Sequence, residues 1–167
     1  IGALTSTQLQ GLTTLQMSAL AATQVPALRT TYINSLSTAQ LNALGTSQIA
    51  VLTTGQIANL SSSQMASISI TALSGMSTAQ ISGMTSTQIK AITTNQVVSL
   101  TTNQIAAIST ASIGSLSSIQ MNAMSLAQIK ALSSAQIGNF SAIQIASLTT
   151  ADIGILSTAQ IGGMTST

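Results

Sequence analysis

The chain has no cysteine, no histidine and no tryptophan, and charged side chains make up only 2% of its 167 residues. Without Cys and His it lacks the side chains that most often bind zinc, ligate haem or carry acid and base catalysis near neutral pH, and it can form no disulfide. These absences predict a protein with no catalytic, cofactor-binding or metal-binding residues. We therefore expect neither enzyme activity nor a small-molecule substrate.

Charge is equally scarce, because Arg29, Lys90, Lys130 and Asp152 are the only ionised side chains. A protein that binds nucleic acid by releasing counterions needs several basic residues acting together, so we expect no nucleic-acid partner. The mean hydropathy of +0.53 is high, but Ser, Thr and Gln interrupt every apolar run well before the eighteen or so residues that a membrane span needs. No transmembrane segment is predicted.

What the chain does contain is one eight-residue repeat. Residues 4–163 divide into twenty octads without an insertion or deletion. If the positions of an octad are lettered a to h, with Leu36 at position a, then positions a and f are large and apolar in all twenty. Position b is Ser or Thr in seventeen octads, and position e is Gln in sixteen. We expect residues 1–167 to form a single repeat array that is a segment of a longer chain.

The spacing of Ser or Thr at b and Gln at e is that of a capping box, in which the hydroxyl accepts from the N3 amide and the Gln side chain accepts from the N-cap amide. Positions a and f then fall where a helix start places its two apolar staple residues. Each octad is thus a helix start with room for only about seven residues, too few for a helix that is stable alone. The pattern predicts an all-α solenoid with one very short helix per octad. The abundance of Thr and Ile leaves a β-solenoid as the alternative.

A longer period appears in the octads that lack Gln at position e. They carry Tyr32, Ala72, Ser112 and Asp152, which follow one another at intervals of five octads. A duplicated 40-residue segment explains this spacing. We also consider a structural explanation, in which five octads form one superhelical turn, so that equivalent residues of every fifth octad lie above one another. Small residues at positions d, g and h would then let successive turns pack closely.

Two of these exceptions invite a functional reading. Asp152 is the only carboxylate, and at the N3 position of a short helix it is best explained as a cap that favours the helix dipole. Tyr32 lies near Ala21, Pro26 and Arg29, so we interpret this stretch as two degraded repeats and a local irregularity.

Other residues fit structural roles. Lys90 and Lys130 are five octads apart and would share one exterior stripe if five octads make one turn. All seven methionines fall at positions a or f, which predicts core packing. The N-glycosylation patterns that begin at Asn59 and Asn139 arise whenever position h is Asn, so we give them little weight.

The octads Leu-Ser-Thr-Ala-Gln-Ile and Leu-Thr-Thr-Asn-Gln-Ile resemble the long octapeptide tracts of very large secreted or surface proteins of bacteria, which are often labelled adhesins. The resemblance covers essentially the whole chain, and it implies an extracellular or cell-surface location and an extended repeat array. It transfers no catalytic or binding residue.

These observations predict a structural repeat protein that forms an extracellular rod, fibre or filament. Weak charge repulsion favours association with copies of the same chain. A stalk or spacer of a surface adhesin is the alternative, in which specificity lies in other parts of the protein. Ice binding is a less favoured alternative, because Ser and Thr interchange freely and the hydroxyl at position b is needed for capping.

Overall fold

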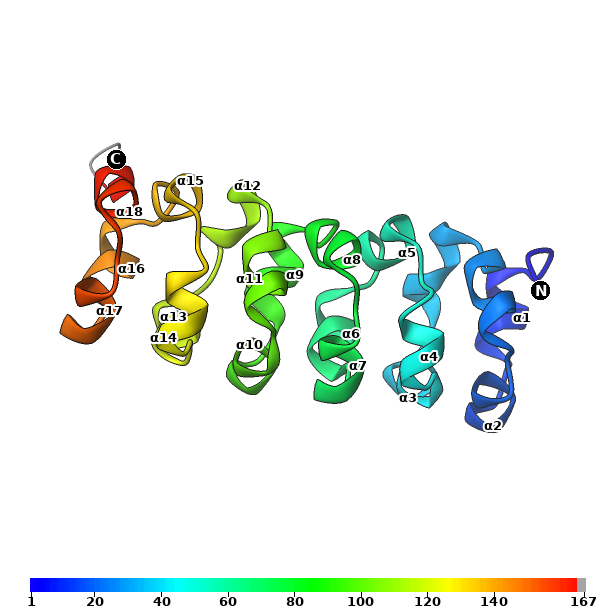
Figure 1. Cartoon of the computed structure of the whole chain (residues 1–167). Helices are drawn as coiled ribbons and strands as arrows, with labels where there is room; N and C mark the ends of the chain where they lie inside the picture. Colours follow the sequence, from blue (N-terminus) through cyan, green and yellow to red (C-terminus); the bar gives the residue numbers. More distant parts are fainter. Residues whose placement is uncertain (165–167) are drawn as a thin grey trace.

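The computed structural model describes residues 1–164, which form a rod of short helices with the two ends of the chain at opposite ends of the rod (Figure 1). Each octad contributes one helix, and no strand occurs in the described range. The predicted all-α solenoid is therefore confirmed, and the β-solenoid alternative is wrong. The helices, with η marking the 3₁₀ type, are α1 (Ser6–Gln10), α2 (Thr14–Ser18), η1 (Ala22–Ala27), η2 (Thr30–Ser35), α3 (Thr38–Ala43), α4 (Thr46–Ile49), α5 (Thr54–Ala58), α6 (Ser62–Ser67), α7 (Ile70–Ser74), α8 (Thr78–Ser82), α9 (Ser86–Ala91), α10 (Thr94–Ser99), α11 (Thr102–Ala107), α12 (Thr110–Ile113), α13 (Ser118–Asn122), α14 (Leu126–Lys130), α15 (Ser134–Ile137), α16 (Ala142–Ala146), α17 (Thr150–Gly154) and α18 (Thr158–Gly163).

The start of each regular helix is a capping box, as α5 illustrates. The Thr53 hydroxyl accepts a hydrogen bond from the Gln56 amide at 3.1 Å, and the Thr53 amide donates to the Gln56 side-chain oxygen at 2.9 Å. Thr53 itself is extended, with φ −70° and ψ 158°. The next residue at position a, Leu60, closes the helix by donating to the Ile57 carbonyl at 3.0 Å. Because both ends are closed within one octad, the repeat length sets the helix length.

The two degraded octads form 3₁₀ helices in place of α-helices, which confirms the predicted irregularity. In η1, Pro26 has no amide hydrogen to complete an α-helical turn. In both η1 and η2 the N-cap residue, Ala21 or Arg29, makes no side-chain cap hydrogen bond. Val25 and Ile33 remain fully buried all the same. The octad therefore tolerates a change of helix type as long as its apolar positions are kept.

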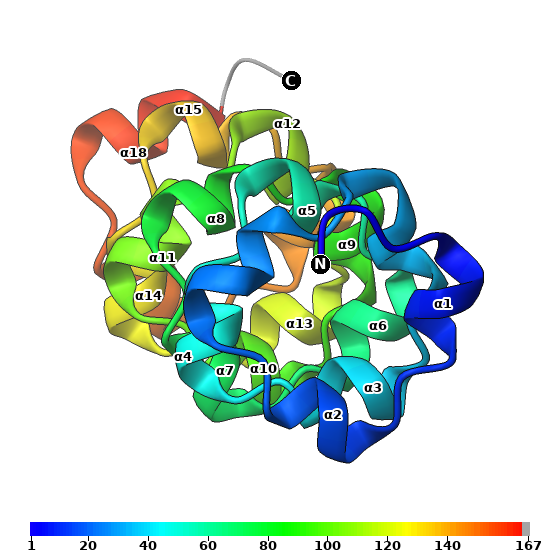
Figure 2. The same ribbon diagram turned by 90° about the vertical axis from the view of Figure 1, so that its right-hand side faces the viewer.

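The helices that pack against one another lie three octads apart in the sequence. This spacing sorts them into three rows, which are α1, η2, α5, α8, α11, α14, α17; then α2, α3, α6, α9, α12, α15, α18; and finally η1, α4, α7, α10, α13, α16. The view along the rod shows the second row winding around the axis from α2 through α6 and α12 to α18 (Figure 2). The rows wind because one turn of the coil takes more than three octads but fewer than four.

Hydrogen bonds between turns give the length of that turn. Side chains at position e reach carbonyl oxygens 28 to 31 residues earlier, so a turn takes about 28 residues, or three and a half octads. The 40-residue turn is therefore wrong, and the five-octad spacing of the exceptions has no counterpart in the geometry of the coil. Lys90 and Lys130 are exposed, but their separation of five octads is well over one turn, so they do not share a stripe.

The core explains why the turn is this tight. Positions a and f from nearly all octads form one continuous apolar cluster, with Ile57, Met65 and Leu73 among its fully buried members. With sides of about 12 Å, each a helix and its corner, a ring of three and a half sides has an inner radius of about 5 Å. One layer of Leu, Ile or Met fills that space, whereas a five-sided ring needs two. Six of the seven methionines are buried in this cluster and Met164 is packed against it, as predicted.

Small residues let the turns approach closely, and the closest approaches are at positions g and h. A Cβ atom added to Gly114 would lie 2.6 Å from the Asn139 carbonyl oxygen of the next turn, and one added to Gly163 would lie 2.5 Å from the Ser134 carbonyl oxygen. Position d faces outward, where Leu15 is 78% exposed. Position d still contacts the neighbouring turn in places, since a Cβ atom added to Gly55 would lie 3.6 Å from Thr30 Cγ2.

Candidate functional site

The polar contact that recurs most regularly along the chain is a set of hydrogen bonds from Gln at position e to the preceding turn. From Gln40 onward, every Gln at position e makes two kinds of hydrogen bond. Its Oε1 atom accepts a hydrogen bond from the backbone amide of its own N-cap residue, and its Nε2 atom donates to carbonyl oxygens of the preceding turn. The acceptors lie 28 residues earlier, at a position a, and in each of these repeats also 31 or 30 residues earlier, near the end of a helix. We call this arrangement the glutamine clamp.

Gln56 shows the clamp in its most buried form. Its Nε2 donates to the Val25 carbonyl at 3.0 Å and to the Leu28 carbonyl at 2.8 Å, and its Oε1 accepts from the Thr53 amide at 2.9 Å. The side chain is 0% exposed. Each clamp thus joins three backbone groups of two successive turns and satisfies the buried side-chain amide, as a polar side chain in a core requires.

The first turn provides an internal comparison. Gln8, Gln16 and Gln24 have no preceding turn in the described chain, and all three side chains are exposed. They keep only the capping half of the clamp, in which Oε1 accepts from the N-cap amide at 2.9 Å. The capping role and the inter-turn role of Gln are therefore separable within one molecule.

Sequence reasoning identified the capping role of Gln and missed the inter-turn role. A signal for it was present, because a capping box accepts either Glu or Gln at this position and the chain uses Gln sixteen times and Glu never. Only the amide carries hydrogen atoms to donate. A strict preference for Gln over Glu at a repeated cap position indicates a second set of acceptors.

The octads without Gln replace the clamp in different ways. Ser112 is short, but its hydroxyl still donates to the Met84 carbonyl 28 residues earlier, at 3.1 Å. Ala72 is buried and has nothing to donate. Asp152 is buried and caps α17 by accepting from the Thr149 amide at 2.8 Å and from the Thr149 hydroxyl at 2.7 Å. The predicted cap at Asp152 is thus confirmed.

Tyr32 and Arg29 form a small cluster on the first two turns. The Arg29 guanidinium carbon lies 5.5 Å from the centre of the Tyr32 ring, within the range of a cation–π contact. Arg29 Nε also donates to the Gly2 carbonyl at 3.1 Å. The hydrogen bond to Gly2 holds the N-terminal residues against the start of η2, whereas the contact with Tyr32 lies within η2 and its N-cap.

The two residues of the glycosylation patterns, Asn59 and Asn139, are exposed and sit at helix ends. Their side chains donate back into their own helices, to the Gly55 carbonyl at 2.9 Å and to the Ala135 carbonyl at 2.8 Å. Each side-chain amide thus satisfies an end carbonyl of a short helix. The structure explains both residues without a modification.

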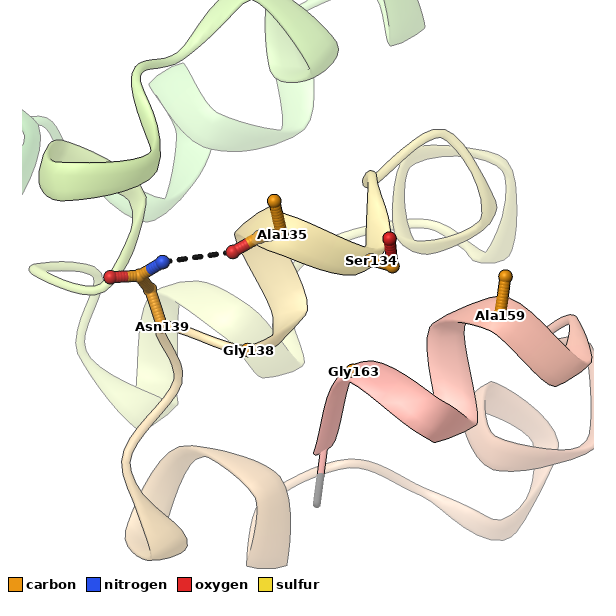
Figure 3. A pocket seen from close by; sticks show the side chains of 6 residues that line it. All are labelled: Ser134, Ala135, Gly138, Asn139, Ala159 and Gly163. Carbon is orange, nitrogen blue, oxygen red and sulfur yellow. Dashed lines mark hydrogen bonds between the residues drawn. The ribbon is translucent and has the colours of Figure 1, made fainter. Parts of the chain in front are cut away.

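A hollow of about 390 Å³ lies between α15 and α18 and is lined by small side chains (Figure 3). Its lining residues are Ser134, Ala135, Gly138, Asn139, Ala159 and Gly163. They include no ionisable group, so the hollow offers no acid, base or charged contact to a substrate. The prediction that the chain has no catalytic residue and no cofactor remains a prediction.

No helix within residues 1–164 is long and apolar enough to cross a membrane. No curated protein and no solved structure matches the chain. The family model of the ALTTAQ repeat matches residues 30–62, 65–102, 97–134 and 105–142, which together make up more than half of the sequence. The matched segments contain both the capping boxes and the glutamine clamps. The chain belongs to the ALTTAQ repeat family.

Proposed function

We propose that this chain is a rod segment of an extracellular or cell-surface protein of bacteria, and that its role is to provide length and stiffness. The observation that carries the proposal is the glutamine clamp, which ties each regular turn to the turn before it. A coil held in this way resists both stretching and bending, because either motion separates buried hydrogen-bonded groups. At about 28 residues a turn and 8 to 10 Å between packed helices, the rod is about 50 to 60 Å long.

The chemistry of the surface supports a location outside the cell. The chain has no thiol to be oxidised and almost no charge for pH or salt to act on. Most hydroxyl groups at position b accept a hydrogen bond from the N3 amide of their own helix, as the Thr53 hydroxyl does from the Gln56 amide at 3.1 Å. The three rows of helices wind around the rod, so these hydroxyls do not form the flat array that an ice-binding face requires.

Electron microscopy of purified chains and of longer tandem arrays tests the proposal. We expect straight rods whose length grows by about 9 Å for every 28 residues added, and we expect them to associate side by side or end to end. Single rods that never associate and that carry globular domains at one end in the parent protein would favour the alternative, a stalk of a surface adhesin. Compact particles, or flexible chains whose end-to-end distance grows as the square root of length, would contradict both.

A further inference from the structure

The octad of residues 68–75 packs like its neighbours but has no glutamine clamp. Its helix, α7, contacts α4 of the preceding turn and α10 of the following turn, and its apolar residue Leu73 is fully buried. Ala72 takes the place of the clamp glutamine at position e. An alanine side chain has no hydrogen-bond donor and no acceptor, so packing rather than a clamp joins α7 to the turn before it.

The next octad, residues 76–83, is a matched comparison within the same molecule. Both octads end in Ser-Gly and are followed by Met. Their glycines pack alike on the preceding turn, because a Cβ atom added to Gly75 would lie 3.0 Å from Thr46 Cγ2, and one added to Gly83 would lie 3.2 Å from Thr54 Cβ. With the backbone packed in the same way, position e is what decides the hydrogen bonding between turns.

The two octads are therefore joined to the coil with different strength. Gln80 donates to the Ile49 and Leu52 carbonyls of the preceding turn, at 2.9 and 2.8 Å. Its side-chain oxygen also accepts from the Ser77 amide at 2.8 Å. Ala72 can make none of these three bonds. Separating α8 from the turn before it breaks buried hydrogen bonds and leaves their groups without partners, whereas separating α7 breaks apolar contacts and no clamp.

The helices of the later octads without Gln lie on alternating sides of the rod. Ser112 on α12 is an intermediate case, since its hydroxyl still donates to the Met84 carbonyl, and Asp152 on α17 accepts from Thr149 of its own octad. Figure 1 shows α7 and α17 along the lower edge of the rod and α12 along the upper edge, and Figure 2 also places α7 and α12 on opposite sides. The interval of 40 residues, divided by about 28 residues per turn, is nearly one and a half turns. Openings at these octads would bend the rod in opposite directions, so that the net change is a lengthening.

We propose that the octads without Gln at position e are built-in opening points, at which successive turns separate before the clamped octads around them do. Residues 68–75 form the weakest of these points in the interior of the chain. In a rod that bears load, tension then lengthens the coil at one point in every five octads while the clamped octads between stay folded. This consequence rests on the proposed rod function, whereas the opening points themselves rest only on the hydrogen bonds at position e.

Hydrogen exchange of the ¹⁵N-labelled chain, followed by NMR under native conditions, tests the opening points, because the exchange of a buried amide reports local opening. The loss of the inter-turn bonds predicts that the amides of residues 73–76 have protection factors at least about tenfold below those of residues 81–84. Both segments lie well inside the chain, so fraying at its ends does not affect the comparison. Equal protection in the two octads of the native chain would overturn the proposal.

Ala72→Gln and Gln80→Ala form a reciprocal pair of variants. Restoring a clamp should raise the protection of residues 73–76 at least about tenfold, and removing one should lower that of residues 81–84 by a similar factor, in each case with a smaller change in the other octad. If Ala72→Gln does not fold, Gln80→Ala decides alone. A loss of protection that Gln80→Ala spreads evenly over all octads would also overturn the opening points, because the coil would then open only as a whole.

Pulling the chain by its two ends in optical tweezers tests the response to tension separately. The force at which the chain first lengthens should rise in Ala72→Gln and fall in Gln80→Ala, because forced opening follows the barrier at the weakest point. Equal forces in the native chain and both variants would overturn the link between the opening points and lengthening. The exchange measurement needs no rod, so a failure of the rod in electron microscopy is distinguishable from a failure of the opening points.

Discussion

The glutamine clamp can be tested at Gln56, where it is fully buried. Gln56→Ala removes two hydrogen bonds to the preceding turn, at 3.0 and 2.8 Å, and one to the N-cap amide of Thr53, at 2.9 Å. Each bond contributes about 0.5 to 1.5 kcal/mol net, and the one buried methylene group that is lost adds about 0.8 kcal/mol. On these values we expect the free energy of unfolding to fall by about 2 to 5 kcal/mol.

Gln16→Ala is the matched control, because Gln16 keeps the same capping bond to Thr13, at 2.9 Å, but is exposed and makes no inter-turn bond. We expect this variant to lose only about 0.5 to 1 kcal/mol. The measurement is urea unfolding of both variants and the native chain, followed by circular dichroism. If the two alanine variants differed by less than about 0.5 kcal/mol, which is the effect of an ordinary surface substitution, the inter-turn bonds would contribute nothing measurable and the reasoning would be refuted.

Gln56→Glu separates the two roles of the side chain more sharply. A capping box works with Glu as well as with Gln, so capping alone predicts little change. The clamp predicts a loss at least as large as that of Gln56→Ala, because the carboxylate cannot donate and would face the carbonyl oxygens of Val25 and Leu28. A Glu variant as stable as the native chain at neutral pH would show that the inter-turn donor is dispensable.

Three further predictions follow from the packing of the turns. Gly114→Ala should lower the free energy of unfolding by about 1 to 3 kcal/mol, because the new Cβ meets the Asn139 carbonyl oxygen at 2.6 Å. Gly154→Ala is at the same octad position but has nothing within 4 Å, so it should be neutral or stabilising. Urea unfolding of both variants checks this difference. Ala72→Gln should raise the free energy of unfolding by about 1 to 2 kcal/mol, because it restores a missing clamp. A destabilised variant would mean that the residues around Ala72 leave no space for the longer side chain. Small-angle X-ray scattering should give a maximum dimension of about 60 Å and the profile of a rod, whereas five octads per turn would give a shorter and thicker particle.

The outcome for the four octads without Gln illustrates the limits of a long sequence period. Their interval of five octads is as regular as the octad itself, yet the coil repeats after about three and a half octads, so Ala72 and Ser112 do not lie above one another. A period that arises from duplication of a gene segment need not coincide with a geometric one. The octad predicts structure reliably because its residue types make specific contacts within one helix. The five-octad interval corresponds to no contact between residues.

The sequence by itself determined the class of the fold, the start and length of each regular helix, and the positions that form the core. These features follow from interactions within one octad, since a capping box and its staple join residues at most five apart. Sequence also located the irregular stretch around Pro26, because a missing amide hydrogen is a local defect.

Only the tertiary structure decided how many octads make a turn, and with it the second role of Gln. The pitch depends on the angle at each corner and on how Leu, Ile and Met fill the axis, which are properties of many residues acting together. Once the turn takes three and a half octads, the side-chain amide of Gln56 meets the carbonyls of Val25 and Leu28. Contacts between residues a whole turn apart leave no local pattern in the chain, except for the preference for Gln over Glu.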